Sequence, residues 1–199
     1  MEGLDGALAA LPHPDSDETV VAAPGRLWSC RVDGVELIPD GQGGDNVVVL
    51  SPRSVTRRVV WEVSPVSGSG NLKAVRAVLS GMSSSLLLGS EDPGSAVAAI
   101  PSSGEVDGAD GERLTGSFGS FGCPGGTACR HILTLYCWSD HGNVMASWDV
   151  TDQVHAASDG DIHIVVTVPG GISIPDENSG SFDPGVDGWD DNRFSDIIM

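Results

Sequence analysis

Lysine is almost absent from this chain, and basic residues of any kind are few. One lysine and nine arginines stand against 28 aspartate and glutamate residues, which gives a formal net charge of −18. So acidic a chain repels nucleic-acid phosphates, and it has no basic cluster large enough for the counterion release that drives nucleic-acid binding. The nearest candidates, Arg53, Arg57 and Arg58, are interpreted as the rim of a strand whose arginines pair with acidic neighbours. We therefore expect no direct contact with nucleic acid.

Long apolar runs are missing as well. No stretch approaches the ~18 consecutive apolar residues that a membrane-spanning helix needs. Residues 1–5 lack the basic start and apolar continuation of a secretory signal. The sequence thus predicts a chain without a membrane span that is made in the cytoplasm. Its four cysteines are expected to be thiols, because that compartment is reducing.

Catalytic and nucleotide-binding motifs are also missing. The run Gly116–Gly122 only superficially resembles G-x-S-x-G, and it fits neither of the phosphate-binding glycine patterns. It is interpreted as a flexible loop that docks Phe118 and Phe121. The aspartates fall repeatedly in Asp-Gly pairs, which are typical of turns, and they form no aspartic-protease triplet. We therefore expect no enzyme activity and no cofactor.

What the sequence does have is a β pattern punctuated by turns. Its 27 glycines and 12 prolines predict many short elements, and Asp33-Gly34 predicts a type I′ hairpin between two apolar runs. Strands are expected at 27–32, 35–38, 46–50, 58–63, 132–138, 144–150 and 162–168.

Two segments between these strands receive other predictions. The apolar spacing over 72–88 fits a helical stripe and predicts one short helix. Residues 89–116 are polar and acidic, and they predict a long surface loop with a weak strand at 97–100. Together the patterns predict one mainly β domain, a β-sandwich or jelly-roll-like barrel with at most one or two short helices.

Acidic segments flank the predicted β domain. The expected division is an N-terminal arm at 1–25, the β domain at 26–174 and a C-terminal arm at 175–199. Each arm holds apolar residues that could anchor it to the domain or to a neighbouring chain. These predicted interface anchors are Leu4, Leu8, Leu11, Trp189, Phe194, Ile197 and Ile198.

Cysteine and histidine gather in one short stretch. Zinc prefers four thiolate or imidazole ligands, often from closely paired cysteines, but no C-x-x-C pair occurs here. The stretch leaves open a zinc site, a disulfide between Cys123 and Cys129, a reactive thiol, or ordinary thiols, which is the default; Cys30 is expected in the core. The weak metal candidates are Cys123, Cys129, His131, Cys137 and His141.

The tryptophans allow two interpretations. Flat indole rings can stack on sugars, yet Trp61, Trp138 and Trp148 lie on predicted strands and are expected in or near the core. Trp189 is interpreted as an anchor of the C-terminal arm. The acidic residues around it, at 183–192, could offer oxygens to Ca²⁺ but lack the order of an EF-hand loop.

These features favour a structural protein over an enzyme. The leading hypothesis is a non-enzymatic assembly protein on the outer surface of a virus particle, as a capsid-associated, decoration or protrusion component. It would form a homo-oligomer and dock on a larger protein shell or scaffold through a sheet face and its arms. The alternatives are a carbohydrate-binding β module, with or without calcium, and a zinc or thiol enzyme.

Overall fold

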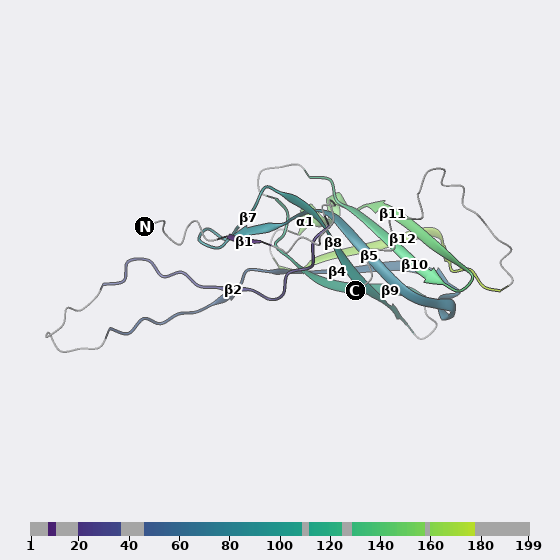
Figure 1. Cartoon of the computed structure of the whole chain (residues 1–199), viewed down its shortest axis with the longest axis horizontal. Helices are drawn as coiled ribbons and strands as arrows, with labels where there is room; N and C mark the ends of the chain where they lie inside the picture. The colour runs from purple at the N-terminus through teal and green to yellow at the C-terminus, as the bar shows by residue number, and fades with distance from the viewer. Residues whose placement is uncertain are drawn as a thin grey trace.

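The main body of the protein is one curled β-sheet. The computed structural model describes residues 8–10, 20–36, 46–108, 112–124, 129–157 and 160–177. Seven strands follow one another in the order β11-β10-β5-β8-β9-β4-β12 and curl into a nearly closed barrel (Figure 1). They are β4 (Arg57–Ser67), β5 (Leu72–Ser83), β8 (Val97–Asp107), β9 (Arg113–Ser120), β10 (Ile132–Ser139), β11 (Gly142–Asp149) and β12 (Ile162–Ser173). All neighbours are antiparallel except β4 and β12, which are parallel. The mainly β prediction is confirmed.

Shorter elements lie outside this sheet. A three-stranded sheet has the order β1-β6-β7, and β2 pairs with β3. A 3-10 turn, η2, precedes β5, and the helix α1 lies between β11 and β12. Their bounds are β1 (Leu8–Ala10), β2 (Trp28–Ser29), β3 (Arg53–Ser54), η2 (Ser69–Asn71), β6 (Ser85–Leu87), β7 (Asp92–Pro93) and α1 (Thr151–Ala156).

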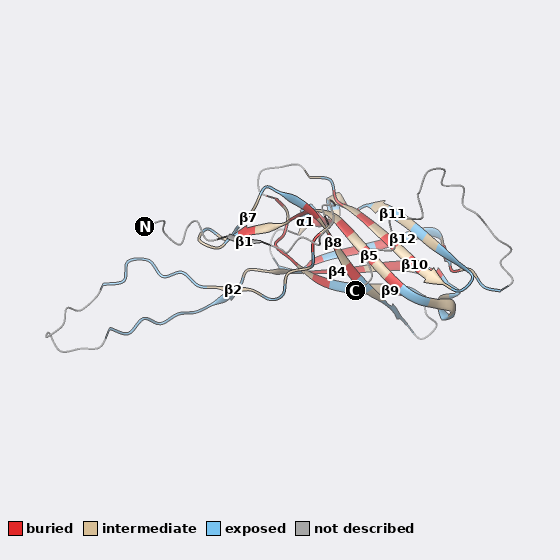
Figure 2. Ribbon diagram, in the orientation of Figure 1, coloured by how far each residue is buried: buried red, intermediate tan, exposed pale blue. Residues whose placement is uncertain are grey.

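The core fills the inside of the barrel. Side chains of a strand alternate between two faces, and on β4 the inward set is Val59, Trp61 and Val63, each fully buried. Figure 2 shows a similar alternation of buried and less buried residues along other barrel strands, such as β5 and β10. The Trp61 indole N–H donates a hydrogen bond of 3.1 Å to Ser102 Oγ, so the one polar atom of this ring is satisfied in the core.

The helix α1 attaches to the last strand of the sheet. β12 has a sheet neighbour on one side only, and the side chain of Gln153 bonds to it: Val165 N–H donates to Gln153 Oε1 at 2.7 Å, and Gln153 Nε2 donates to the Val165 carbonyl at 3.1 Å. Val154, on the same helix, is fully buried. An unpaired strand edge invites unwanted pairing, and α1 covers part of this one.

The helix predicted for 72–88 is wrong, because this segment forms β5 and β6. Val75, Ala77 and Leu79 are buried in strand alternation, and Met82 is buried after a register shift between Leu79 and Met82. This β-bulge adds a residue and changes the phase of the pattern. As a result, positions 75, 79 and 82 also match a helical spacing.

The long surface loop predicted for 89–116 is wrong as well, because β7, β8 and the first half of β9 fall within it. The run Gly116–Gly122 is not a flexible loop either. Its first five residues belong to β9, and Phe118 and Phe121 are both buried in the core.

The strands predicted at 58–63, 132–138, 144–150 and 162–168 are confirmed by β4, the β10–β11 hairpin and β12. The hairpin predicted at Asp33-Gly34 is wrong in the described part, because Trp28 and Ser29 pair with Ser54 and Arg53. Residues 46–50 form no strand. The two-residue turn signal is local, whereas the strand pairs that form join residues 24 and 26 positions apart.

The two acidic arms fall largely on residues that the structure does not describe. Of the predicted anchors, Leu8 belongs to β1, which pairs with β6. The anchors Leu4, Leu11, Trp189, Phe194, Ile197 and Ile198 lie outside the described residues, as does the acidic segment 183–192.

Candidate functional site

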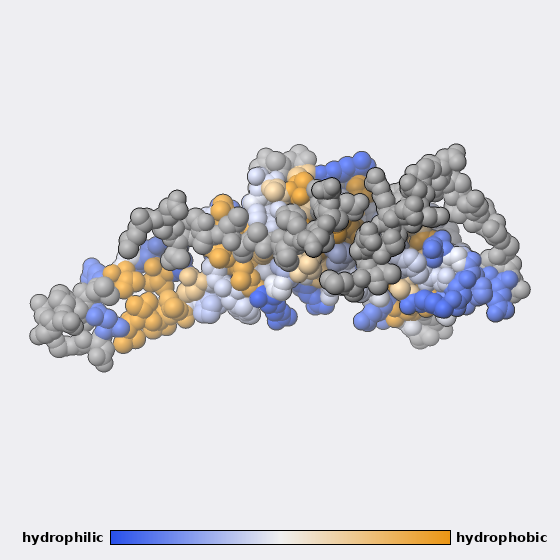
Figure 3. All heavy atoms as spheres, viewed as in Figure 1, coloured by the Kyte–Doolittle hydropathy of each residue, from blue (hydrophilic) through white to orange (hydrophobic). Residues whose placement is uncertain are grey.

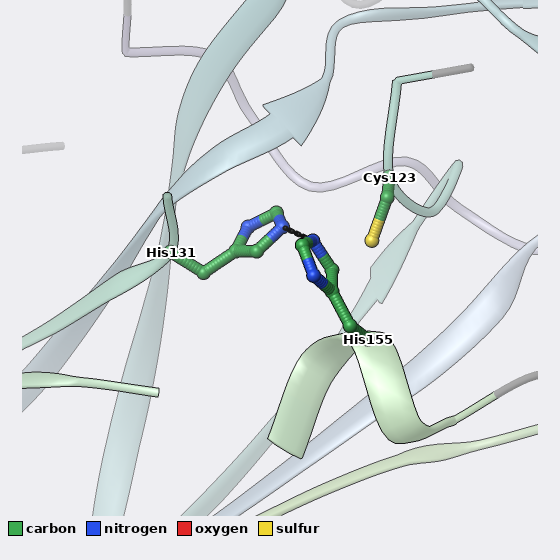
Figure 4. Close-up of side chains that lie close together, drawn as sticks. All are labelled: Cys123, His131 and His155. Atoms are coloured by element: carbon green, nitrogen blue, oxygen red, sulfur yellow. Dashed lines mark hydrogen bonds between the residues drawn. The ribbon is translucent and has the colours of Figure 1, made fainter. Parts of the chain in front are cut away.

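One cysteine and two histidines meet beside the helix α1. The side chains of Cys123, His131 and His155 bring their ligand atoms within 4.8 Å of one another. Figure 4 shows the two imidazole rings facing each other, with the Cys123 sulfur pointing toward His155. The rings stand nearly perpendicular, at 89°, and their Nε2 atoms lie 3.2 Å apart. We call these three residues the Cys-His cluster.

His131 is the fixed member of the cluster. It precedes β10 and is fully buried. Its backbone N–H donates to Thr151 Oγ1 at 2.9 Å, and its carbonyl accepts from Val150 N–H at 2.9 Å. Its ring Nδ1 lies 3.1 Å from the Ser80 carbonyl oxygen. Burial lowers the pKa of this imidazole below its usual value, an effect that the hydrogen bond to Ser80 opposes and nearby His155 reinforces.

Cys123 is positioned by the turn that follows β9. Gly122 N–H donates to Ser120 Oγ at 2.9 Å, and the Gly122 carbonyl accepts from Ser83 N–H at 2.9 Å. The backbone at Gly122 has a φ of +90°, which favours glycine. Burial raises the pKa of the Cys123 thiol, Arg57 lowers it, and Cys129 raises it. Cys123 is therefore a protonated, half-buried thiol at neutral pH.

His155 lies at the exposed side of the cluster, on the last turn of α1. Two open grooves meet at this side chain. One, of about 280 Å³, is also lined by Cys123 and Arg57. The other, of about 560 Å³, is also lined by Cys129 and Asp149. Solutes can therefore reach the cluster from solvent on the side where His155 lies.

The start of α1 is held by Asp149 and Thr151. Asp149 Oδ1 accepts from the Thr151 hydroxyl at 2.6 Å and from the Thr151 backbone N–H at 3.1 Å, and Arg130 donates to Oδ2 at 2.7 Å. These contacts, the Thr151 hydroxyl first, lower the pKa of the Asp149 carboxyl to about 2. Because Thr151 also binds the His131 backbone, this network links α1 to the cluster.

We expect the Asp149 carboxyl to titrate at about 2 in the folded protein, followed by carboxyl ¹³C NMR against pH. A carboxyl with a lowered folded pKa stabilises the fold above its unfolded pKa, and that stability is lost as pH falls from about 4 toward 2. The Thr151→Val variant should move the titration upward. A Thr151→Val titration identical to that of the unmodified protein would contradict the assignment.

The structure brings together some of the predicted metal candidates and separates others. Cys123 and His131 meet, and Cys129 lines a groove with His155. Cys137 is buried on β10, six residues beyond His131, and His141 is exposed in the β10–β11 turn. His155 was missed, because it lies 24 residues after His131 on a helix that the sequence did not reveal. Only the placement of α1 against the barrel could have identified it.

No disulfide joins Cys123 to Cys129, so that alternative is not realised. Cys30 was expected in the core and is instead exposed, which corrects that prediction. Burial raises the pKa of Cys137 to about 11. A thiol with this pKa supplies almost no thiolate at neutral pH, which disfavours it as a nucleophile.

The other distinctive surface is an extended excursion from one end of the barrel, which we call the apolar arm and define as residues 26–36 and 46–54. It reaches away from the barrel beyond β2 (Figure 1), and orange, hydrophobic atoms cover much of it in Figure 3. Its most exposed apolar side chains are Val49 at 79%, Val47 at 78%, Leu50 at 60% and Trp28 at 57%. Soluble proteins rarely expose so many adjacent apolar residues without a partner.

The comparison with known families adds one match. Residues 4–102, just under half of the chain, match a family model described as a domain of unknown function, DUF5119. No curated protein matches the chain.

Three bacterial proteins are among the solved structures that resemble this chain. A "putative adhesin" from Bacteroides ovatus ATCC 8483 is 14% identical, with a TM-score of 0.61 over 90% of this chain and 70% of that protein. A second from Bacteroides ovatus is 11% identical, with a TM-score of 0.51 over 86% and 61%. The fimbrial anchor protein Mfa2 from Porphyromonas gingivalis is 15% identical, with a TM-score of 0.40 over 71% and 50%.

These likenesses correct the leading sequence-based hypothesis. The two Bacteroides ovatus proteins with this fold are each described as a "putative adhesin" and not as components of virus particles, so the prediction of a virion or capsid surface protein is wrong. Short strands, loops and an acidic surface are compatible with both settings, and for that reason composition alone could not separate them. No helix within the described part of the chain is long and apolar enough to cross a membrane.

Proposed function

We propose that this chain is a non-catalytic module of a bacterial cell-surface appendage or adhesin, and that it joins another protein subunit through the apolar arm. The exposure of the arm carries the proposal: three consecutive or near-consecutive aliphatic side chains, Val47, Val49 and Leu50, are each at least 60% exposed. The fold shared with the Bacteroides ovatus proteins supports the setting at a bacterial surface.

The arm favours a different protein as its partner over a second copy of the chain. Two molecules that each carry a net charge of −18 repel one another. A partner with an apolar groove and basic residues around it would match both the aliphatic side chains of the arm and the acidic body. A homo-oligomer is the competing outcome, and the experiment below distinguishes the two.

The carbohydrate-binding alternative has less support. Stacking on sugars needs accessible indole rings, and of the four tryptophans in the described residues only Trp28 is exposed. Trp28 shares the arm with aliphatic side chains, which suit an apolar protein groove. Trp61 is fully buried, and Trp138 and Trp148 are half-buried, as the sequence predicted.

A photo-crosslinking residue placed at Val49, in the full chain expressed in its native bacterium, should join the chain to one other protein of discrete mass. The matched control is the same residue at Val165, which is 53% exposed on β12 and should give no such product. Crosslinking of Val49 only to another copy of the chain, or a product no stronger than that of Val165, would refute the proposal.

Replacing the aliphatic side chains of the arm should abolish this association and leave the fold intact. Each fully buried side chain contributes about 1.5–3 kcal/mol to an interface. The triple variant Val47→Ser, Val49→Ser, Leu50→Ser should therefore bind the identified partner at least about 100-fold more weakly, as measured by titration calorimetry. Its unfolding midpoint should not change, because the arm is exposed in the isolated chain. Unchanged affinity would place the interface elsewhere.

A further inference from the structure

The Cys-His cluster has the ligand types and the spacing of a transition-metal site. We propose that Cys123, His131 and His155 bind one Zn²⁺ ion, which fastens the helix α1 and the turn after β9 to the barrel. Thiolate and imidazole are the ligands that zinc prefers. They come here from three segments that are far apart on the chain but adjacent in space (Figure 4).

The distance between the two imidazoles fits a zinc tetrahedron. With Zn–N bonds of 2.0–2.1 Å, the two nitrogens of a tetrahedral site lie about 3.3–3.4 Å apart. The two Nε2 atoms lie 3.2 Å apart. The Cys123 sulfur lies within 4.8 Å of a ring nitrogen of each histidine. In a tetrahedral site with a Zn–S bond of 2.3 Å, the sulfur and a ligating nitrogen lie about 3.5 Å apart, so a small rotation of the Cys123 side chain would complete the site.

The hydrogen bond at the far side of His131 orients this ring for a metal. A carbonyl oxygen can only accept, so the Ser80 carbonyl fixes the proton of neutral His131 on Nδ1. The Nε2 lone pair of His131 then points toward His155. A backbone carbonyl that holds the non-ligating nitrogen in this way is the usual outer partner of a zinc-bound histidine.

Without a metal, the same geometry is a hydrogen bond in which His155 Nε2–H donates to His131 Nε2. For zinc to bind, the proton of His155 must move to Nδ1, which the exposed position of this side chain permits. The Cys123 thiol must also lose its proton. When these three side chains are the protein ligands, each zinc bound therefore releases one proton from Cys123 to solvent, and the imidazoles remain neutral.

A fourth ligand can enter from the side of His155. Cys129 lines the groove of about 560 Å³ with His155, and it lies close enough to Cys123 to raise the pKa of that thiol. Cys129 is half-buried, so its thiol can be reached from this groove. A site of two thiolates and two imidazoles would be closed and structural, and a site that ends in water would remain open.

The site would strengthen the attachment of a short helix to the barrel. α1 is six residues long and is attached to β12 by the Gln153 bonds and the buried Val154. Helices this short are not stable alone. A Zn²⁺ ion held by His155, His131 and Cys123 would join α1 to the turn after β9 and to the residue before β10. This link would lie on the side of the helix opposite the β12 contact.

Cobalt binding tests the site directly, because Co²⁺ replaces Zn²⁺ and reports its ligands by absorbance. The reduced full chain, stripped of metal, should bind one Co²⁺ with the visible bands of a tetrahedral site and a sulfur-to-cobalt charge-transfer band, and Zn²⁺ should displace it. His155→Ala and Cys123→Ser should each weaken Co²⁺ binding at least 100-fold. Both side chains are exposed or half-buried, so these variants should still fold.

The matched controls are His163→Ala, at an exposed position of β12, and Cys30→Ser, at an exposed position of the apolar arm. Both variants should bind Co²⁺ as the unmodified chain does. Zinc should raise the unfolding midpoint of these controls and of the unmodified chain, and should leave that of His155→Ala unchanged. Absence of the charge-transfer band, or equal binding by His155→Ala and His163→Ala, would overturn the proposal and leave a plain hydrogen bond between two histidines.

Discussion

Replacing Trp61 with alanine should lower the free energy of unfolding by about 3–5 kcal/mol, the range for removal of a fully buried tryptophan. Trp61 is fully buried at the centre of the barrel, and the variant would leave both a cavity and a Ser102 hydroxyl without its indole partner. Two glycines show how closely the ring is packed. A Cβ on Gly104 or Gly116 would lie 2.5 Å from an atom of this ring, closer than real contacts allow. The surrounding strands are therefore shaped to this one side chain.

Chemical denaturation followed by circular dichroism measures this loss. Trp28→Ala is the matched control: it removes an indole of the same size that is 57% exposed, and it should change the free energy of unfolding by no more than about 0.5 kcal/mol. Trp61→Phe should fall between the two, because it keeps part of the ring and loses the bond to Ser102. Equal free energies of unfolding for Trp61→Ala and Trp28→Ala would show that the Trp61 indole contributes little to the packing of the core.

The same packing explains why the sequence revealed only the start of β8, the weak strand predicted at 97–100. This strand contains Pro101, Ser102, Ser103 and Gly104, residue types that are common in loops and poor in strand propensity. They belong to a strand because the Trp61 ring occupies the space above Gly104 and Gly116, where larger side chains would clash. Strand propensity depends on such neighbours, which a local pattern does not contain. By contrast, β4, β10 and β12 are rich in β-branched and aromatic residues, and β11 follows β10 across a turn signal, so the positions of these four strands followed from the sequence.

The candidate site was half visible in the sequence for a comparable reason. Cys123 and His131 are eight residues apart, so their proximity could be predicted from the chain alone. His155 belongs with them only because α1 folds back against the barrel after β11. Cys137 and His141 lie near His131 in sequence, but β10 carries them toward the other end of the barrel. In an extended strand each residue advances about 3.3 Å, so six residues are enough to remove Cys137 from the cluster.

Gly81→Ala should be the most damaging small substitution outside the core, because it affects both stability and the Cys-His cluster. Gly81 occupies the bulge of β5 with a φ of +79°, which costs a residue with a Cβ about 1–3 kcal/mol. The new Cβ would also lie 2.4 Å from the Arg130 carbonyl oxygen and 2.8 Å from His131 Nδ1. Relief of this overlap costs about another 1–3 kcal/mol and must displace His131, the fixed member of the cluster.

Two other glycines separate the causes of this loss. Gly170 has a φ of +84° with nothing within 4 Å of its Cβ position, so Gly170→Ala should show the backbone strain alone. Gly25 has an open Cβ position and no positive φ, so Gly25→Ala should leave stability unchanged or slightly raised.

We expect the free energy of unfolding to fall in the order Gly25→Ala, Gly170→Ala, Gly81→Ala, and Co²⁺ affinity to fall in Gly81→Ala only. If Gly81→Ala lost no more stability than Gly170→Ala and kept its Co²⁺ affinity, the bulge would not support His131. If it lost stability and kept Co²⁺ affinity, the strand could absorb the clash without moving the ring, and the orientation of His131 would rest on Ser80 and Thr151 alone.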